Sequence, residues 1–234
     1  MGIRRGSIST PIVVDGLVLN MDAANRASYP KTGTTWTDTI DGNNGTLTNG
    51  PVFDSDGGGS IDFDGSDDRV QTINNTGISG INARSLCIWV YPTELTTDKF
   101  YSPLRIGTTS TAQLFEILLR NNTIFGHFWG GGQAYSVSSD KTLLNNYSHI
   151  VMTYSNPNVK IYVDGELKGT SGSFTLNTSN TILSSGNPAY GGHDYYEGRI
   201  PNIQLYNRAL SASEVLQNYN ALKGRFGLWN SGIE

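Results

Sequence analysis

The chain has 234 residues, and only 15% of them are charged, against a usual share of about 25%. Its length and its 28 glycines suit one large all-β domain, while scarce lysine and glutamate argue against a coiled coil. The net charge is −4 with 16 basic residues, and no apolar run approaches the ~20 residues of a membrane span. The sequence therefore predicts neither a nucleic-acid partner nor a membrane partner.

The N-terminal stretch, residues 1–12, is expected to be a short basic arm. Arg4 and Arg5 have no apolar segment after them, so this stretch does not have the pattern of a signal peptide. The single Cys87 cannot form an internal disulfide, so the sequence carries no mark of an oxidising compartment. We expect a protein that is assembled in the cytoplasm and leaves the cell by another route, such as lysis.

Alternating apolar residues predict strands through the first half of the chain. Gly16–Ala23 and Gly59–Gly65 each place apolar side chains on one face and polar ones on the other. Ser85–Tyr91 is apolar on both faces, which is typical of a central strand covered on each side, and Pro92 is expected to end it. Asn43–Gly50 is polar and indicates a turn rather than a strand.

The second half continues the pattern of short strands and turns. Asn121–Asn122 indicates the turn of a hairpin, and Asp164–Gly165 is a strong signal for a tight turn, because glycine tolerates a positive φ. The predicted strands are Ala112–Arg120, Ile124–Trp129, Tyr147–Tyr154, Val159–Val163, Glu166–Thr170, Thr181–Ser184 and Gly198–Tyr206.

One helix is predicted near the C-terminus. Ser211 and Glu214 have the spacing of a capping box, apolar residues then recur at helical spacing, and Gly224 stands where the helix should end. About a dozen strands and this helix predict an all-β, two-sheet antiparallel β-sandwich. Residues 224–234 are expected to form a tail outside the core.

Several segments, in their order along the chain, carry a family signature. They are GLVLNMDAAN at 16–25, SIDFDGSDDRV at 60–70, SLCIWVYPT at 85–93, YSHIVMTYSNPNVKIYVDGELKGT at 147–170 and YYEGRIPNIQLYNRALSASEVLQNYNA at 195–221. With them the chain resembles the concanavalin A-like, laminin G-like (LamG-like) jelly-roll domains over residues 13–223. The resemblance implies two antiparallel sheets of about six or seven strands, curved into convex and concave faces.

The same resemblance implies a structural calcium ion between the first and the penultimate strand. Asp22 stands at the first-strand position, and Asn202 stands where the penultimate strand usually has an aspartate, which removes one negative charge from the site. The alternative is that Asp22 only caps a turn, together with Asn25.

Glycan binding needs aromatic faces beside polar groups, and two segments offer them. Phe125, His127 and Trp129 alternate onto one face of a predicted strand. The glycine-rich loop that follows residue 190 adds His193 and the pair Tyr195 and Tyr196, which we expect to be exposed. The alternative is that Phe125 and Trp129 fill the core of the sandwich.

Catalysis is not expected. Glucanases that resemble this fold carry a Glu-x-Asp-x-x-Glu strand motif, because a nucleophile and an acid must share one face. This chain has no such motif: Glu116 is alone in its apolar strand, and a single carboxylate cannot serve as both groups. The three histidines are scattered along the sequence without metal-ligand spacing.

Both ends of the chain suggest assembly. Arg4 and Arg5 lie in the N-terminal arm, and Phe226, Leu228 and Trp229 place three large apolar side chains in a polar tail. Either the tail packs on its own domain or it clamps a neighbouring subunit or capsid surface. GTTWTDT at 33–39 and ALKGRFGL at 221–228 resemble segments of bacteriophage structural proteins.

The predicted function is therefore a non-enzymatic virion structural or decoration protein that adheres to host-surface glycans. Its partners would be other virion proteins, or further copies of itself. The alternative is an extracellular carbohydrate-binding adhesion module from a bacterium, and a glycoside hydrolase of the same fold is the third hypothesis.

Overall fold

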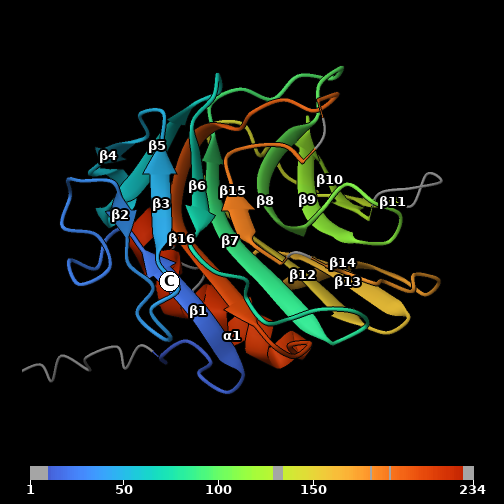
Figure 1. Cartoon of the computed structure of the whole chain (residues 1–234). Coiled ribbons are helices and arrows are strands. Elements are labelled where there is room, and N and C mark those ends of the chain that lie inside the picture. Colours follow the sequence, from blue (N-terminus) through green and yellow to red (C-terminus); the bar gives the residue numbers. More distant parts are fainter. Residues whose placement is uncertain (1–9, 129–133, 180, 190, 229–234) are drawn as a thin grey trace, which may run out of the picture.

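The computed structural model describes residues 10–128, 134–179, 181–189 and 191–228, which form a two-layered β-sandwich with one α-helix (Figure 1). Every ladder between its strands is antiparallel, as the sequence predicts. Among the helices in the described part of the chain, none has the length and apolar character needed to cross a bilayer.

The first sheet has eight strands, with β7 at its centre. In spatial order they are β14 (Glu166–Ser171), β13 (Asn158–Val163), β12 (Ser148–Ser155), β7 (Arg84–Pro92), β16 (Glu197–Tyr206), β5 (Ser60–Asp64) and β4 (Val52–Asp54), and β1 (Leu17–Asp22) pairs with β16 beside this row. A short 3-10 helix, η1 (Asp56–Gly58), joins β4 to β5.

The second sheet also has eight strands, and β8 and β9 lie near its centre. In spatial order they are β11 (Ala134–Ser138), β10 (Thr123–His127), β9 (Leu114–Arg120), β8 (Tyr101–Gly107), β15 (Leu183–Ser185), β6 (Arg69–Thr72), β3 (Gly45–Thr48) and β2 (Thr35–Trp36). The outward face of this sheet, which carries alternate residues of β8, β9 and β10, is called the pocket face below.

The core between the sheets is built by alternation along each strand. Leu86 and Ile88 of β7 and Phe115 and Ile117 of β9 are fully buried in one cluster. The intervening residues of β7 point out of the sandwich, yet Cys87 and Trp89 are also buried. The strand is therefore covered on both sides, which confirms the prediction from its apolar sequence.

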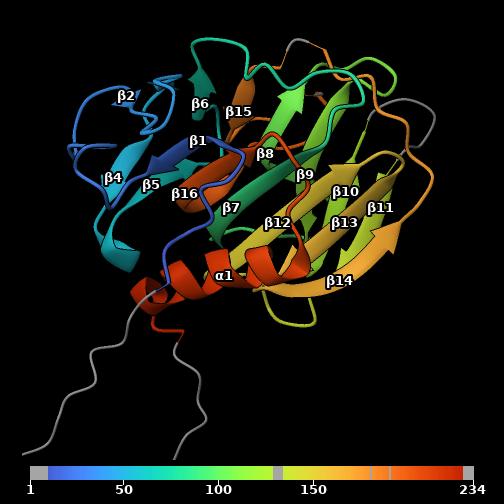
Figure 2. The ribbon, with the colours of Figure 1, turned by 90° about the horizontal axis from the view of Figure 1, so that it is seen from below.

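The covering layer on the first sheet is the helix α1 (Ala212–Leu222), which lies against β7, β12 and β13 (Figure 2). Its N-terminus has the predicted capping box, in which the Ser211 side chain accepts from the Glu214 N–H and the Glu214 carboxylate accepts from the Ser211 N–H. A 3-10 helix, η2 (Lys223–Phe226), follows directly. The outward face of the first sheet under α1 and η2 is called the helix face below.

The prediction was wrong for several strands of the second sheet. β3 lies in the segment predicted as a turn, and its Gly45 serves packing: a Cβ atom there would lie 2.6 Å from the Cγ2 of Val70. β8 was not predicted, because Pro103 and Arg105 interrupt its apolar sequence, and β11 has a polar, exposed outer face.

Candidate functional site

A group of polar side chains surrounds the buried Glu116 on the pocket face. Glu116 belongs to β9, and the register places Arg105 of β8 on one side of it and His127 of β10 on the other. The Glu116 side chain is fully buried, and Ser102 donates its hydroxyl hydrogen to Oε1 at 2.7 Å. A carboxylate buried in this way is costly unless it is paired, so its partners define the site.

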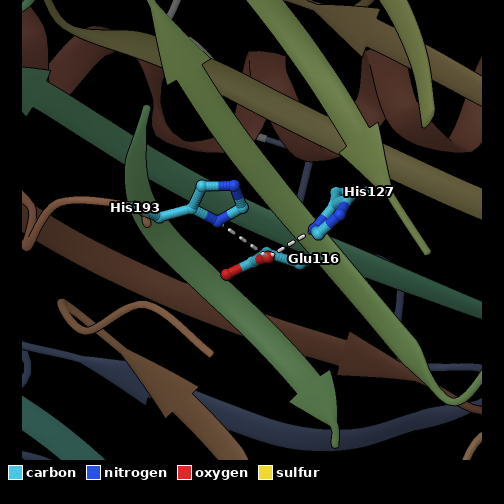
Figure 3. A group of neighbouring side chains, drawn as sticks. All are labelled: Glu116, His127 and His193. Carbon is cyan, nitrogen blue, oxygen red and sulfur yellow. Dashed lines mark hydrogen bonds and ion pairs between the residues drawn. The ribbon is translucent and has the colours of Figure 1, made fainter. Parts of the chain in front are cut away.

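Two histidines lie on either side of the Glu116 carboxylate (Figure 3). Nδ1 of His127 is 2.9 Å from Oε2, and Nδ1 of His193 is 3.8 Å from the same oxygen. The two imidazole rings lie 5.1 Å apart at their centroids, nearly perpendicular to each other. The expectation that the histidines are scattered is therefore wrong for this pair, because the fold brings residues 127 and 193 to one carboxylate.

His193 lies in the connection between β15 and β16, which backbone hydrogen bonds attach to β8. The Asp194 N–H donates to the Phe100 carbonyl at 2.7 Å, and Asp194 forms an isolated bridge with Tyr101. The His193 ring is largely buried, and this burial lowers its pKa, while Glu116 and Asp194 oppose the shift. Its imidazole is therefore held in place and favoured in the neutral form.

A polar hollow of about 450 Å³ lies beside this group on the same face. It is lined by Gln71, Thr72, Arg105, Gly107, Thr108, Thr109, Ile182 and Ala189. The hollow adjoins the Glu116 group through two of its lining residues: Arg105 is opposite Glu116 in the ladder, and the Ala189 N–H donates to Oε1 of Glu116 at 3.4 Å.

Among the described residues that line this hollow, Arg105 is the only cation. Its guanidinium donates from Nε to the Asn187 carbonyl at 3.2 Å and from Nη1 to the Gly107 carbonyl at 3.4 Å. Burial lowers the pKa of Arg105, and the neighbouring Glu116 opposes this shift. An arginine stays charged under such a shift, so the lining of the hollow has a fixed positive group.

An aromatic group lies on the other side of the histidines. Phe125, on β10, is half-buried on the pocket face, so the alternative that it fills the core is wrong. The Arg120 guanidinium lies 5.1 Å from the centroid of the Phe125 ring and 4.4 Å from that of Phe100. Phe100 also contacts His193, with ring centroids 5.5 Å apart.

The remaining predicted glycan residues lie in different environments. Tyr195 is half-buried, but Tyr196 is fully buried, so its predicted exposure is wrong. Consecutive residues point to opposite sides of an extended chain, and the Tyr196 ring packs edge-on against Phe63, with centroids 6.4 Å apart. Trp129 lies outside the described residues.

The predicted calcium position is occupied by a different interaction. Asp22 and Asn202 are opposite each other in the β1–β16 ladder, as the resemblance implies. However, Nη1 of Arg225 lies 2.9 Å from both carboxylate oxygens of Asp22, and the Ala24 N–H also donates to Oδ1. The Asn202 amide donates to the Met21 carbonyl at 3.0 Å. These residues do not fit a calcium ion, because the positive charge beside Asp22 comes from Arg225.

The predicted assembly residues are also placed differently from the expectation. Phe226 packs on its own domain, with its ring centroid 4.3 Å from that of Trp89 and 4.5 Å from that of Tyr147. The contacts of Phe226 correspond to the alternative in which the tail packs on its own domain, while a contact with a neighbouring subunit stays a prediction. Leu228 is half-buried, and Arg4, Arg5 and Trp229 lie outside the described residues.

Some of the site was accessible to sequence reasoning and some was not. The predicted two-residue turn at Asn121–Asn122 fixes a hairpin register, and that register already places Glu116 opposite His127. Arg105 was missed because its strand was missed. His193 reaches the group through the path of a connection that no periodicity reveals.

A second hollow, of about 580 Å³, lies where the β13–β14 turn meets α1. It is lined by charged residues that already pair with one another: Lys141 with Asp164, and Lys168 with both Asp140 and Glu166. The Tyr219 ring on its wall lies beneath the Lys223 amine, 5.3 Å from it. The charged side chains of this hollow named above therefore already have partners within the domain.

The sequence profile of the concanavalin A-like lectin/glucanases superfamily matches residues 64–216, which is more than half of the chain. A search among curated proteins finds no significant match.

Solved structures with the same fold share few residues with this chain. Domain 4 of the arabinanase AbnA from Geobacillus stearothermophilus, solved in complex with arabinotriose, is 17% identical with a TM-score of 0.66, and the match covers 87% of this chain and 98% of that domain. The Trypanosoma rangeli sialidase in complex with sialic acid is 19% identical with a TM-score of 0.68, covering 94% of this chain and 36% of the sialidase. The receptor-binding domain of botulinum neurotoxin type G is 15% identical with a TM-score of 0.64, and the match covers 88% of this chain and 51% of that chain. At these identities the likeness shows the fold.

Proposed function

Because the chain belongs to the concanavalin A-like lectin/glucanases superfamily, we propose that it is a lectin-like protein that binds a carbohydrate on its pocket face. The observation that carries this proposal is the 450 Å³ polar hollow beside the Arg105–Glu116 pair. Its size is within the usual range for small-molecule sites, roughly 300–1,000 Å³.

The lining of the hollow has the chemistry that sugar hydroxyls need. Gln71, Thr108 and Thr109 are half-buried and carry side chains that can both donate and accept hydrogen bonds. Arg105 adds a fixed charge to the lining, where a hydrogen bond to a ligand is stronger than one between neutral groups. Beyond the histidines, the half-buried Phe125 ring offers an apolar surface against which further sugar units can pack.

Ligands of the structural neighbours support the same class of ligand. The arabinanase domain holds arabinotriose and the sialidase holds sialic acid. We extend only the class, a carbohydrate, to this chain, since the identities are 17% and 19%.

We propose binding without hydrolysis. A glycosidase needs two carboxyl groups that flank the scissile bond. On the pocket face, the residues two positions from Glu116 along β9 are Leu114 and Leu118, and those opposite it are Arg105 and His127. The sheet therefore gives Glu116 no acidic neighbour of the kind that the glucanase motif supplies.

A glycan panel tests the proposal, with arabinotriose and sialic acid included as defined probes. We expect micromolar to millimolar binding of at least one glycan, as is common for single small sites. Gln71→Ala removes hydrogen bonds from the hollow and should weaken that binding by ~10-fold, while Thr109→Trp fills the hollow and should abolish it. Asn220→Ala in the second hollow is the matched control and should leave the affinity unchanged. Binding that is lost in Asn220→Ala but retained in Thr109→Trp would overturn the proposal.

Display on a virus particle is the second candidate function, and the placement of the two chain ends supports the attachment that it requires. The Gln217 side chain on α1 donates to the Pro11 carbonyl at 2.8 Å, and the Leu228 N–H donates to the Lys223 carbonyl. Both ends of the described chain therefore lie on the side of the helix face, away from the pocket face. Attachment through the ends would leave the pocket face directed outward.

The test of this second function is incorporation into purified particles, followed by mass spectrometry. Because Phe226 is part of the domain, the truncation must remove only residues 1–9 and 229–234. We expect the truncated chain to be lost from particles while it keeps the glycan affinity of the full chain. Unchanged incorporation of the truncated chain would exclude attachment through its ends.

A further inference from the structure

The Glu116 group has the donor set of a metal site. The donors are one carboxylate oxygen and two imidazole nitrogens, and these atoms all lie within 4.8 Å of one another. Two histidines with one glutamate are a common ligand set for zinc when the metal keeps one open position. Calcium prefers six to eight oxygen ligands, so this group is poorly suited to it.

The distances between the donors are close to those of a zinc site. Nδ1 of His127 and Nδ1 of His193 lie 2.9 and 3.8 Å from the same Oε2 atom of Glu116. In a tetrahedral zinc site with bonds of about 2.0–2.1 Å, neighbouring donor atoms are about 3.3 Å apart. The two observed distances lie on either side of that value, and the ligand atoms of all three residues lie within 4.8 Å of one another, so an ion would replace the His127–Glu116 hydrogen bond with small movements of the side chains.

The surrounding residues orient the carboxylate as a ligand. The Ser102 hydroxyl and the Ala189 N–H both donate to Oε1, which leaves Oε2 directed toward the histidines. Such contacts to a ligand's second atom fix its orientation and raise metal affinity. On β8, backbone hydrogen bonds of Asp194 hold the segment that carries His193.

The local charge also favours a cation. Glu116 and Asp194 are acidic, and Asp194 lies next to His193 in the chain. Arg105, opposite Glu116 in the ladder, directs its hydrogen bonds to the Asn187 and Gly107 carbonyls. Both histidine side chains keep partial access to solvent, 16% for His127 and 12% for His193, so an ion can enter.

We infer that Glu116, His127 and His193 bind a divalent transition metal of the zinc class on the pocket face. A metal held there would have an open coordination position, where a water molecule or a hydroxyl group could bind. This inference does not depend on the proposed carbohydrate ligand, because its test uses metal alone.

The test is isothermal titration of the chelator-treated full chain with Zn²⁺ and, separately, with Ca²⁺. We expect one Zn²⁺ per chain and no comparable binding of Ca²⁺. His127→Ala and His193→Ala each remove one imidazole that would bind the metal, and each should weaken Zn²⁺ binding by more than about 100-fold. Both side chains are partly exposed, so neither substitution should unfold the domain. The Co²⁺-loaded chain should have the visible absorption of a four- or five-coordinate ion, which both variants should lose.

A matched control comes from the acidic residues Asp64, Asp67 and Asp68, whose carboxylates also lie close together. Asp67→Ala should leave Zn²⁺ affinity unchanged. Absence of Zn²⁺ binding, or Zn²⁺ binding that persists in the His127→Ala/His193→Ala double variant, would overturn the inference. Circular dichroism of the double variant shows whether it is folded, and if it is not, the two single variants decide.

Discussion

The two outward faces of the sandwich use similar residues for different purposes. On the helix face, His149 lies against the Trp89 ring, with centroids 5.1 Å apart. Tyr219 of α1 stacks on both of these rings. On the pocket face, two histidines lie beside a carboxylate and a polar hollow. The chain covers the first face with its own helix, and in the described residues no helix covers the second.

The covering layer decides what each histidine can do. His149 is 2% exposed, and burial among aromatic rings lowers its pKa to about 3, so it stays neutral and acts as a packing group. His127 and His193 keep access to solvent and contact an acid. We conclude that the helix face stabilises the domain and that the pocket face is available to a ligand.

The largest expected effect comes from removing the central ring of the helix face. Trp89 is fully buried and contacts His149, Tyr219 and Phe226. Trp89→Ala should lower the free energy of unfolding by about 3–5 kcal/mol, measured by urea denaturation. Phe125→Ala, the matched change on the pocket face, should cost only about 1 kcal/mol because that ring is half-buried. Equal losses would contradict the division between the faces.

The pH dependence of stability should report His149. Its pKa in the folded protein is about 3, below the ordinary value of 6.5. Below pH 6.5 this imidazole is therefore protonated in the unfolded chain but stays neutral in the folded chain. Stability attributable to this group is therefore lost as the pH falls from 6.5 toward 3, by about 1.4 kcal/mol per pH unit. Between pH 7 and 4.5 the loss should be about 2–3 kcal/mol.

The measurement for this prediction is a set of denaturation curves at several pH values for the natural chain and for His149→Phe. The phenylalanine keeps an aromatic ring in the stack but cannot titrate, so the difference between the two stabilities should change with pH. If the two chains lose stability in parallel, His149 is not the group responsible.

A smaller effect is expected at the end of the helix face. Phe226 is half-buried against Trp89 and Tyr147, and Phe226→Ala should lower the free energy of unfolding by about 1–2 kcal/mol. Leu228→Ala, two residues further along, serves as the control and should cost less than about 0.5 kcal/mol. If Phe226→Ala leaves the free energy of unfolding unchanged, the ring does not stabilise the domain, and contact with a neighbouring molecule becomes the better explanation of its position.

The smallest effect concerns calcium. Since Arg225 already contacts both oxygens of Asp22, millimolar CaCl₂ should shift the melting temperature by less than about 1 °C, measured by thermal unfolding with and without chelator. A rise of several degrees that disappears in Asp22→Asn would show that calcium displaces the arginine.

The sequence predicts the fold much better than it predicts the site. Alternation in Gly59–Gly65 and double-sided burial in Ser85–Tyr91 correspond to β5 and β7, because a buried sheet face imposes a period of two on its residues. The helix is predicted by its capping box. These signals are local, and they suffice for a sandwich.

The site depends on contacts that are distant in sequence. His193 is 77 positions from Glu116, and it reaches that residue only because Asp194 bonds to β8. Arg225 lies near the other end of the chain, and its number differs from that of Asp22 by 203. No periodicity encodes such contacts, so the sequence could not indicate that Arg225 pairs with Asp22 or that Phe226 packs against Trp89.

Hydrogen exchange followed by mass spectrometry can locate the ligand on the sandwich, with the strongest-binding glycan of the panel as the probe. We expect the glycan to protect backbone amides in residues 104–109, 113–118 and 182–189, which border the pocket face. Protection confined to residues 163–168 and α1 would instead place the ligand at the second hollow and would exclude binding on the pocket face.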